Sequence, residues 1–239
     1  MELSYKGTDY FGWQRQPNDV SVQEVLEDAL TKLHSNQAVS VVGCGRTDTG
    51  VHAHHYVLHF DFETIPDPEQ FVFKLNRMLP DSIAVHRVQE QPEDFHARFQ
   101  ATERTYRYYI HTRKDAFLSE QSWYFPQTLD FSTMNQAAQH LLGKQDFTSL
   151  SKLHTDVKTN VCDVRFAAWN QVDDHRHYFE IRADRFLRNM VRATVGTLIE
   201  VGLGKISPQE VRNILDAKNR QAAAMSVPPQ GLYLWEISY

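Results

Sequence analysis

Apolar and polar positions in the first ninety residues follow two different periods. Apolar residues recur at helical spacing over residues 22–33 and 68–78, and the capping box Ser21-Val22-Gln23-Glu24 begins the first of these stretches. Four short stretches have the composition or the alternation of strands: residues 2–5, 39–42, 56–62 and 82–90. The pattern therefore predicts the order β-α-β-β-α-β for this part of the chain.

The second half of the chain shows the same order. Strands are predicted at residues 102–111, 161–169, 177–183 and 231–239. Helices are predicted at residues 130–142, 186–201 and 208–216, and residues 114–127 form an irregular loop. Each half has the element order of a ferredoxin-like unit. We therefore expect an α+β fold of two such halves, residues 1–95 and 96–239, with mixed or antiparallel sheets packed around a central cleft.

A glycine-rich stretch from Gly43 to Ala53 separates two of the predicted strands. Its three glycines, at positions 43, 45 and 50, should let the backbone turn tightly at positive φ. Arg46 and Asp48 would then be held at the end of a strand pair, where catalytic side chains are often mounted. The residues alone leave two interpretations open, a catalytic loop and a polar hairpin whose aspartate caps its own turn.

Charge is distributed unevenly along the 239 residues. The formal net charge is −5, which for the whole chain argues against a nucleic-acid binder. However, residues 182–192 contain four arginines and one acid, and residues 98–114 contain five basic residues and one acid. These segments could line a basic cleft on an acidic body or simply face solvent. The content of 41% hydrophobic and 23% charged residues is that of a globular protein.

Cysteine content and hydropathy exclude several classes of protein. Cys44 and Cys162 are the only cysteines, so neither a disulfide framework nor a thiolate zinc site is indicated, and Cys44 is interpreted as a buried structural thiol. No apolar run approaches the roughly 18 residues that a membrane span needs, and no signal peptide is recognisable. We therefore expect a cytoplasmic protein without a membrane partner.

The residues around the glycine-rich stretch are compatible with more than one chemistry. His52, His54, His55 and His59 fall within eight residues. His52 and His54 would share one strand face and could hold a zinc ion with Asp48, but no HExxH motif supplies a second ligand set. We expect no metal, and a metal-dependent hydrolase using these histidines remains an alternative. GxGxxG, GxxxxGK[ST] and GxSxG motifs are absent, which argues against a phosphate-binding loop and a serine nucleophile.

A carboxylate nucleophile with cationic support is the chemistry that remains. Asp48 could act covalently if an arginine kept its charge and aimed it, and Arg192 on an apolar predicted helix is a candidate. Tyr106 lies between Arg104 and Arg107, as expected for a ring that stacks on a base with phosphate contacts around it. The ordinary alternatives are a solvent-exposed arginine on a helix and a tyrosine that faces the core.

Residues 45–53, Gly-Arg-Thr-Asp-Thr-Gly-Val-His-Ala, closely resemble the GRTDAGVHA signature of the tRNA pseudouridine synthase A family. Thr49 stands where the family pattern usually has Ala, and the first strand is short enough that the natural chain is expected to begin earlier. Six further segments match the family in the family's order: residues 11–16, 94–99, 106–108, 146–149, 190–192 and 231–234. The resemblance thus covers nearly the whole chain.

This resemblance implies a cofactor-free isomerase that converts uridines 38 to 40 of the tRNA anticodon stem-loop to pseudouridine. It implies that Asp48 is the nucleophile, attacking either ribose C1′ or uracil C6, and that Arg192 pairs with it and keeps it ionised. Tyr106 would stack on the flipped uracil and is the candidate acceptor of the C5 proton. The residues implied to bind RNA are Arg46, Arg188, Arg107, Arg15 and again Tyr106. A homodimer in which tRNA contacts both subunits is also implied. The alternative from another class is a non-enzymatic RNA-binding protein with RRM-like sheets, although an RNP1-like aromatic pattern is missing.

Overall fold

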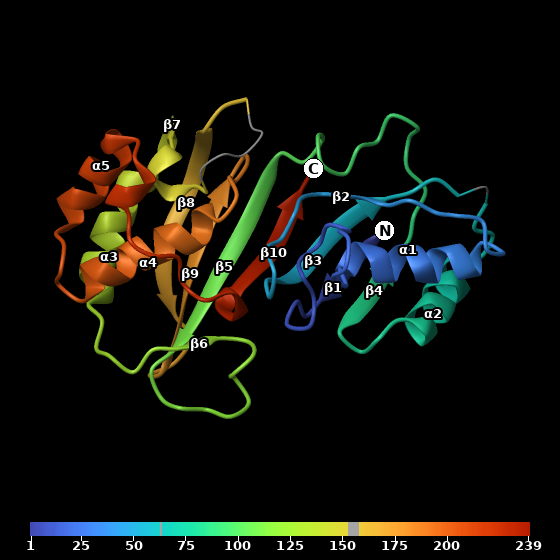
Figure 1. Ribbon diagram of the computed structural model, residues 1–239, viewed down its shortest axis with the longest axis horizontal. Coiled ribbons are helices and arrows are strands. Elements are labelled where there is room, and N and C mark those ends of the chain that lie inside the picture. The colour runs from blue at the N-terminus through green and yellow to red at the C-terminus, as the bar shows by residue number, and fades with distance from the viewer. Residues whose placement is uncertain (63, 153–157) are drawn as a thin grey trace. The chain divides into compact units, whose positions relative to one another are not determined.

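The computed structural model describes residues 1–62, 64–152 and 158–239, and the chain folds into two compact units (Figure 1). The first unit comprises Met1–Thr102 together with Tyr233–Tyr239. The second comprises Glu103–Leu232. Within the described part of the chain, no helix combines the length and apolar character needed to cross a membrane.

The first unit is built on a mixed sheet in the order β4-β1-β3-β10. Its strands are β1 (Glu2–Tyr5), β2 (Val42–Gly43), β3 (His52–His59), β4 (Ile83–Arg87) and β10 (Leu232–Ser238). Strand β1 is antiparallel to β3 and β4, whereas β10 is parallel to β3. Ala53 of β3 pairs with Tyr5 on one side and with Leu234 on the other, so β10 lies on the edge of β3 opposite to β1.

Two amphipathic helices accompany this sheet, α1 (Val22–Leu33) and α2 (Pro68–Met78) (Figure 1). The Ser21 side chain caps α1 by accepting a hydrogen bond from the backbone N of Glu24 at 3.2 Å. Asp67 caps α2 in the same way, and Pro68 occupies the first turn. The predicted bounds of both helices are confirmed, because caps and apolar period are local features that the sequence displays directly.

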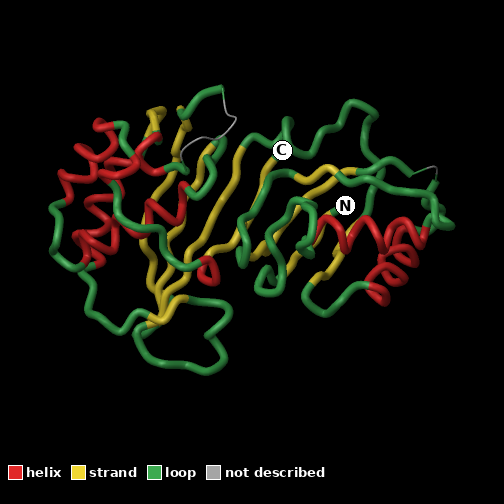
Figure 2. The backbone as a smooth tube through the Cα atoms, in the orientation of Figure 1, coloured by secondary structure: helices red, strands yellow, loops and turns green. Residues whose placement is uncertain are grey.

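The second unit contains an antiparallel sheet in the order β5-β9-β8-β7 with helices packed beside it (Figure 2). Its strands are β5 (Glu103–His111), β6 (Trp123–Tyr124), β7 (Gly143–Asp146), β8 (Val161–Gln171) and β9 (Arg176–Ala183). Its helices are α3 (Phe131–Ala138), α4 (Met190–Gly202) and α5 (Pro208–Ala217), with four short 3₁₀ turns, η1 (Gln139–Leu141), η2 (Thr148–Leu150), η3 (Arg220–Ala222) and η4 (Pro229–Gly231). The two-residue strand β6 pairs in parallel with β5.

Three predicted elements differ from the structure in their bounds, and one strand is additional. Helix α4 begins at Met190 rather than at residue 186, because Asn189 adopts a left-handed conformation with φ 66° that a helix cannot pass through. Strand β3 occupies residues 52–59 rather than 56–62, so the end of the glycine-rich stretch is already strand. The predicted strand 39–42 is reduced to Val42–Gly43. Strand β7 was not predicted, since its sequence Gly-Lys-Gln-Asp has no apolar alternation to mark it.

The last strand also lies elsewhere than its position in the sequence suggested. It was expected to complete the C-terminal half, but β10 pairs with β3 and groups with the first unit. Pairing between residues about 180 positions apart leaves no trace in a local hydrophobic pattern.

Candidate active site

The loop that carries Asp48 is bound by aromatic residues of the first unit. The hydroxyl of Tyr56 on β3 donates a hydrogen bond to the Gly45 carbonyl, and the hydroxyl of Tyr5 on β1 lies 2.8 Å from Thr47 Oγ1. The backbone N of Trp13 donates to the Thr47 carbonyl at 3.2 Å. These contacts therefore fix the residue on each side of Arg46.

Burial alternates along this loop. Thr47 is buried, Asp48 is half-buried, and Arg46 and Thr49 are exposed. Since Thr47 turns inward, Arg46 is presented to solvent and Asp48 remains accessible. This is the arrangement that a reactive carboxylate on a rigid support requires.

Only one of the three glycines of the stretch has the positive φ that was expected, Gly50 at 75°. Gly43 serves a different purpose, because a Cβ there would lie 2.1 Å from the Tyr56 hydroxyl and 2.7 Å from Trp13. Gly45 has open space around its Cα. A fourth glycine, Gly12, has φ +84° and a Cβ there would lie 2.5 Å from the Thr47 carbonyl oxygen. Close approach therefore explains Gly43, whereas Gly12 combines close approach with a positive φ.

The four histidines of β3 have separate partners. His52 Nδ1 accepts a hydrogen bond from Gly7 N at 3.0 Å, and the His54 ring stacks on Trp235. His55 Nε2 lies 4.0 Å from a Glu2 carboxylate oxygen, and His59 Nδ1 accepts from Ala97 N at 3.1 Å. Among the described residues, no group of three His, Cys, Asp or Glu side chains is arranged to hold a metal ion. The geometry gives these histidines structural contacts.

Tyr106 lies on β5 of the second unit and is half-buried. Its ring packs edge-on against Phe186 with the centroids 4.9 Å apart. Because side chains alternate along a strand, Tyr106 shares its face with Arg104 and the fully buried Tyr108, whereas Arg107 lies on the opposite face. The expected flanking of Tyr106 by two cations is therefore met only by Arg104.

Arg107 binds a carboxylate of its own sheet. Its Nε donates to Glu180 Oε2 on β9 at 2.7 Å, and Arg182 donates to the other oxygen of the same carboxylate at 2.9 Å through Nε. Glu180 is 3% exposed, so its charge needs both arginines. The guanidinium of Arg107 also lies 4.7 Å from the centroid of the Tyr178 ring.

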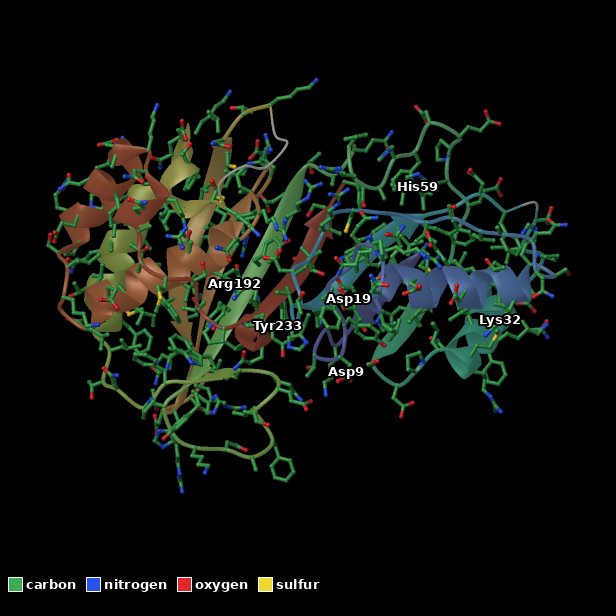
Figure 3. The ribbon with its side chains drawn as sticks, viewed as in Figure 1. Asp9, Asp19, Lys32, His59, Arg192 and Tyr233 are labelled. Carbon is green, nitrogen blue, oxygen red and sulfur yellow. The ribbon has the colours of Figure 1, made fainter. Side chains whose placement is uncertain are left out.

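Arg192 lies in the first turn of α4 (Figure 3). A cation there opposes the helix dipole, so other contacts must hold it. Its Nε donates to the Val227 carbonyl at 2.7 Å, and Val227 N donates back to the Arg192 carbonyl at 3.3 Å. Burial raises the pKa of the Tyr108 hydroxyl, and the positive charge of the nearby Arg192 guanidinium opposes this rise.

The segment that binds Arg192, residues 223–227, is itself held in place. Arg220 donates hydrogen bonds to the carbonyls of Ala223 and Ala224 and to Ser226 Oγ. Asn189, directly before α4, also donates to Ser226 Oγ. Nothing in the sequence indicated this support, because a carbonyl acceptor carries no residue-specific signal.

The other two predicted RNA-binding arginines differ in their surroundings. Arg188 is exposed directly before α4, and its carbonyl accepts a hydrogen bond from Lys152 N. Arg15 donates to Glu27 Oε2 at 3.0 Å and lies 3.4 Å from Glu24, both on α1. The hydrogen bond to Glu27 is the main reason why the pKa of Arg15 is raised.

Each unit thus gathers part of the predicted site. The first holds Asp48, Arg46 and Arg15, and the second holds Tyr106, Arg107, Arg188 and Arg192. The pairing of Arg192 with Asp48 stays a prediction. The sequence analysis missed the supporting roles of Tyr5 and Tyr56, for which an aromatic in a strand gives no distinctive signal. A role of Trp13 at the site could have been predicted, because Trp13 belongs to a segment that resembles the family.

A loop that presents a half-buried carboxylate beside a mixed sheet, in a fold of helices and strands, is an arrangement that an enzyme can use. Comparison with known proteins gives the particular family. Residues 3–100 and 137–239 match the family model described as tRNA pseudouridine synthase, and the chain belongs to this family. Membership makes it an RNA-modifying isomerase of this kind.

Curated relatives resemble the chain over nearly its whole length. A protein of Bacteroides fragilis named tRNA pseudouridine synthase A is 50% identical over 238 residues, covering 99% of this chain and 94% of the relative. A protein of Bacillus subtilis with the same name is 42% identical over 240 residues, covering 99% and 97%. The family resemblance that the sequence motifs indicated is confirmed.

Proposed function

We propose that this chain isomerises uridine to pseudouridine at positions 38 to 40 of the tRNA anticodon stem-loop, with Asp48 as the nucleophile. The observation that carries the proposal is the loop of residues 44–51, which is bound through Gly45 and Thr47 and leaves Asp48 accessible. Family membership supports tRNA as the substrate. The relatives' shared name, tRNA pseudouridine synthase A, supports a reaction of the same type.

The proposed chemistry needs no redox partner and no activated water. The carboxylate of Asp48 attacks either C1′ of the ribose or C6 of the uracil, and the bond between N1 and C1′ breaks. The base turns, a bond forms between C5 and C1′, and the bond to Asp48 breaks, which regenerates the carboxylate. The proton on C5 leaves, and N1 takes up a proton. Because atoms are only rearranged within one nucleoside, we expect no cofactor and no metal.

Tyr106 and Arg192 are proposed to complete the site from the second unit. A uridine in a stem must leave its stack to react, and stacking on an aromatic ring returns about 1–3 kcal/mol per base. Tyr106 is half-buried and fixed by Phe186, which suits such a platform. A guanidinium next to Asp48 would favour its charged form, which is the nucleophilic one.

RNA binding is proposed to involve Arg46, Arg188, Arg107 and Arg15. Arg46 and Arg188 are exposed and suit contacts with phosphate. Arg15 and Arg107 already bind carboxylates of their own units. Any phosphate that they contact must therefore compete with these carboxylates for the guanidinium groups.

Further parts of the proposal concern the assembly. The element order β-α-β-β-α-β of the first unit supports a ferredoxin-like half. The expected division at residues 95 and 96 moves to residues 102 and 103, and residues 233–239 join the first unit. A homodimer and a cytoplasmic location follow from the family resemblance and from the tRNA substrate. Light scattering of the purified protein would test the dimer.

The central test measures release of tritium from tRNA labelled at C5 of uridine, without added cofactor and with excess EDTA. Asp48→Asn should abolish release while tRNA binding survives, because the amide is not a nucleophile. Asp9→Asn, an exposed aspartate of the same unit, is the matched control and should keep full activity. Near-normal turnover by Asp48→Asn would refute the nucleophile, and loss of wild-type activity in EDTA would favour the histidine-based hydrolase.

The position of modification needs a separate measurement. Transcripts in which uridines 38, 39 and 40 are replaced by cytidine should release no tritium. Release from such a transcript at the wild-type rate would place the target elsewhere in the tRNA.

A further inference from the structure

We propose that Tyr5 and Tyr56 are positioning residues that set the geometry of Asp48 through hydrogen bonds to its loop. The inference rests on the proposed role of Asp48 and adds two side chains that do not touch the reacting nucleoside. Tyr5 ends β1 and Tyr56 lies in the middle of the adjacent strand β3. Two neighbouring strands of the sheet thus direct their hydroxyls to one loop.

The two hydroxyls bind the loop at complementary places. Tyr56 Oη donates to the Gly45 carbonyl, and Tyr5 Oη lies 2.8 Å from Thr47 Oγ1. The Thr47 carbonyl is bound separately by Trp13 N, so the peptide that precedes Asp48 is fixed through both the side chain and the backbone of Thr47. A change in either hydroxyl therefore acts on the residues that flank Arg46 and precede Asp48.

Burial explains why these contacts restrict the loop. Tyr56 is 0% exposed, Trp13 is 2% exposed and Tyr5 is 4% exposed. Their rings pack together, with centroids 4.1 Å apart for Trp13 and Tyr56 and 5.5 Å for Tyr5 and Tyr56. Buried hydroxyls need partners, so displacement of the loop would break a hydrogen bond at each of the two hydroxyls.

The absence of a side chain at Gly43 leaves space for the rings of Tyr56 and Trp13. A Cβ at position 43 would lie 2.1 Å from the Tyr56 hydroxyl and within 2.8 Å of two Trp13 ring atoms. The loop can therefore close over the two rings only because residue 43 is glycine. Phenylalanine at position 56 would fill the same ring position without the hydrogen bond to Gly45.

The experiment compares kcat and KM for tRNA in Tyr5→Phe, Tyr56→Phe and the double variant. Each removes one oxygen atom and keeps the ring, so the stack with Trp13 survives. We expect kcat to fall about tenfold in each single variant and about 100-fold in the double variant, because small misplacements of a reacting group have effects of this size. KM for tRNA should stay within about twofold.

Tyr10→Phe provides the matched control. Tyr10 is 5% exposed and its hydroxyl lies 2.7 Å from Ser82 Oγ. Tyr10 contacts the loop through its backbone carbonyl, which accepts a hydrogen bond from Gly50 N at 3.3 Å, and this contact does not involve the hydroxyl. Its variant should lose a similar amount of thermal stability and keep kcat. If the tyrosine hydroxyls only stabilise the fold, all variants will share the kcat of Tyr10→Phe, and this result would overturn the inference, as would a rise of KM at constant kcat.

Failure of the inference and failure of the proposed function give different results. An active Asp48→Asn would remove the proposed nucleophile, whatever the tyrosine variants do. An inactive Asp48→Asn together with a Tyr5→Phe/Tyr56→Phe double variant at wild-type kcat would overturn the positioning role alone. Should the double variant not fold, the two single variants decide the question by the same comparison with Tyr10→Phe.

Discussion

Arginines near the candidate site divide into two kinds at the scale of single residues. Arg15 and Arg107 each bind a carboxylate of their own unit, Glu27 and Glu180 respectively. Glu180 is buried, so removing Arg107 would leave a charge with only Arg182 to balance it. Loss of activity in an Arg107 variant could therefore result from a lost RNA contact or from damage to the sheet, and activity alone would not separate the two causes. Arg46 is exposed and offers a cleaner substitution.

Gly12 gives a prediction at the same scale. Gly12→Ala should lower the free energy of unfolding by about 2 kcal/mol, because a Cβ at φ +84° is strained and would lie 2.5 Å from the Thr47 carbonyl oxygen. Urea denaturation measures this change. Gly45→Ala in the neighbouring loop is the control and should stay within about 0.5 kcal/mol, since nothing lies within 4 Å of its Cβ position. Equal effects of the two substitutions would contradict the explanation by close approach.

Helix α4 is the element on which the position of Arg192 depends. Eleven of its thirteen residues are buried, so the helix is anchored in the second unit along almost its full length. Its first turn is bound to residues 223–227 by the hydrogen bonds between Arg192 and Val227. That segment crosses α4 closely enough that a Cβ at Gly196 would lie 2.0 Å from the Met225 carbonyl oxygen.

Gly196→Ala is predicted to displace this crossing segment. Alanine favours a helix over glycine by about 1 kcal/mol, but the clash with a backbone carbonyl must move the segment that holds Arg192. We expect a net loss of about 1–2 kcal/mol in stability and a fall in kcat. Gly202→Ala on the same helix is the control, because the nearest atom to its Cβ, at 2.5 Å, is the flexible Met134 Sδ. The prediction fails if both variants keep wild-type kcat.

Histidines make the stability of the whole molecule depend on pH. Burial lowers the pKa of His59, His111 and His177 below the ordinary value. The unfolded chain, whose histidines titrate near pH 6.5, therefore binds more protons than the folded chain below that pH. Stability that is fully present above about pH 6.5 is lost as the pH falls, by up to about 1.4 kcal/mol per pH unit for each such group.

His111 offers a test of this dependence. It is 2% exposed, and its Nδ1 lies 3.0 Å from Ser122 Oγ. Urea midpoints of the wild type and of His111→Gln should be compared between pH 7.5 and pH 5.5. The variant should lose less stability over this interval, because glutamine does not titrate. An identical loss in both proteins would exclude His111 as a contributor.

The sequence by itself determined the elements whose signals are local. The caps and apolar periods of α1 and α2 lie within a few residues of each other, and so both helices were predicted with correct bounds. The motif around Asp48 and six further matching segments identified the family, since residue types at fixed spacing are visible in one dimension. The start of helix α4 was predicted four residues too early, because the left-handed conformation of Asn189 has no effect on the hydrophobic pattern.

Tertiary structure decided which distant residues serve the site. The Asp48 loop is bound by Tyr5, 42 positions before Thr47, and Arg192 is bound by a carbonyl 35 positions away. The histidines of β3 are assigned to structural contacts, and β10 joins β3 across most of the chain. Hydrogen bonds and packing over such separations depend on which distant segments the fold brings into contact. A hydrophobic pattern records only which face is buried, so these partners could be known only from the folded chain.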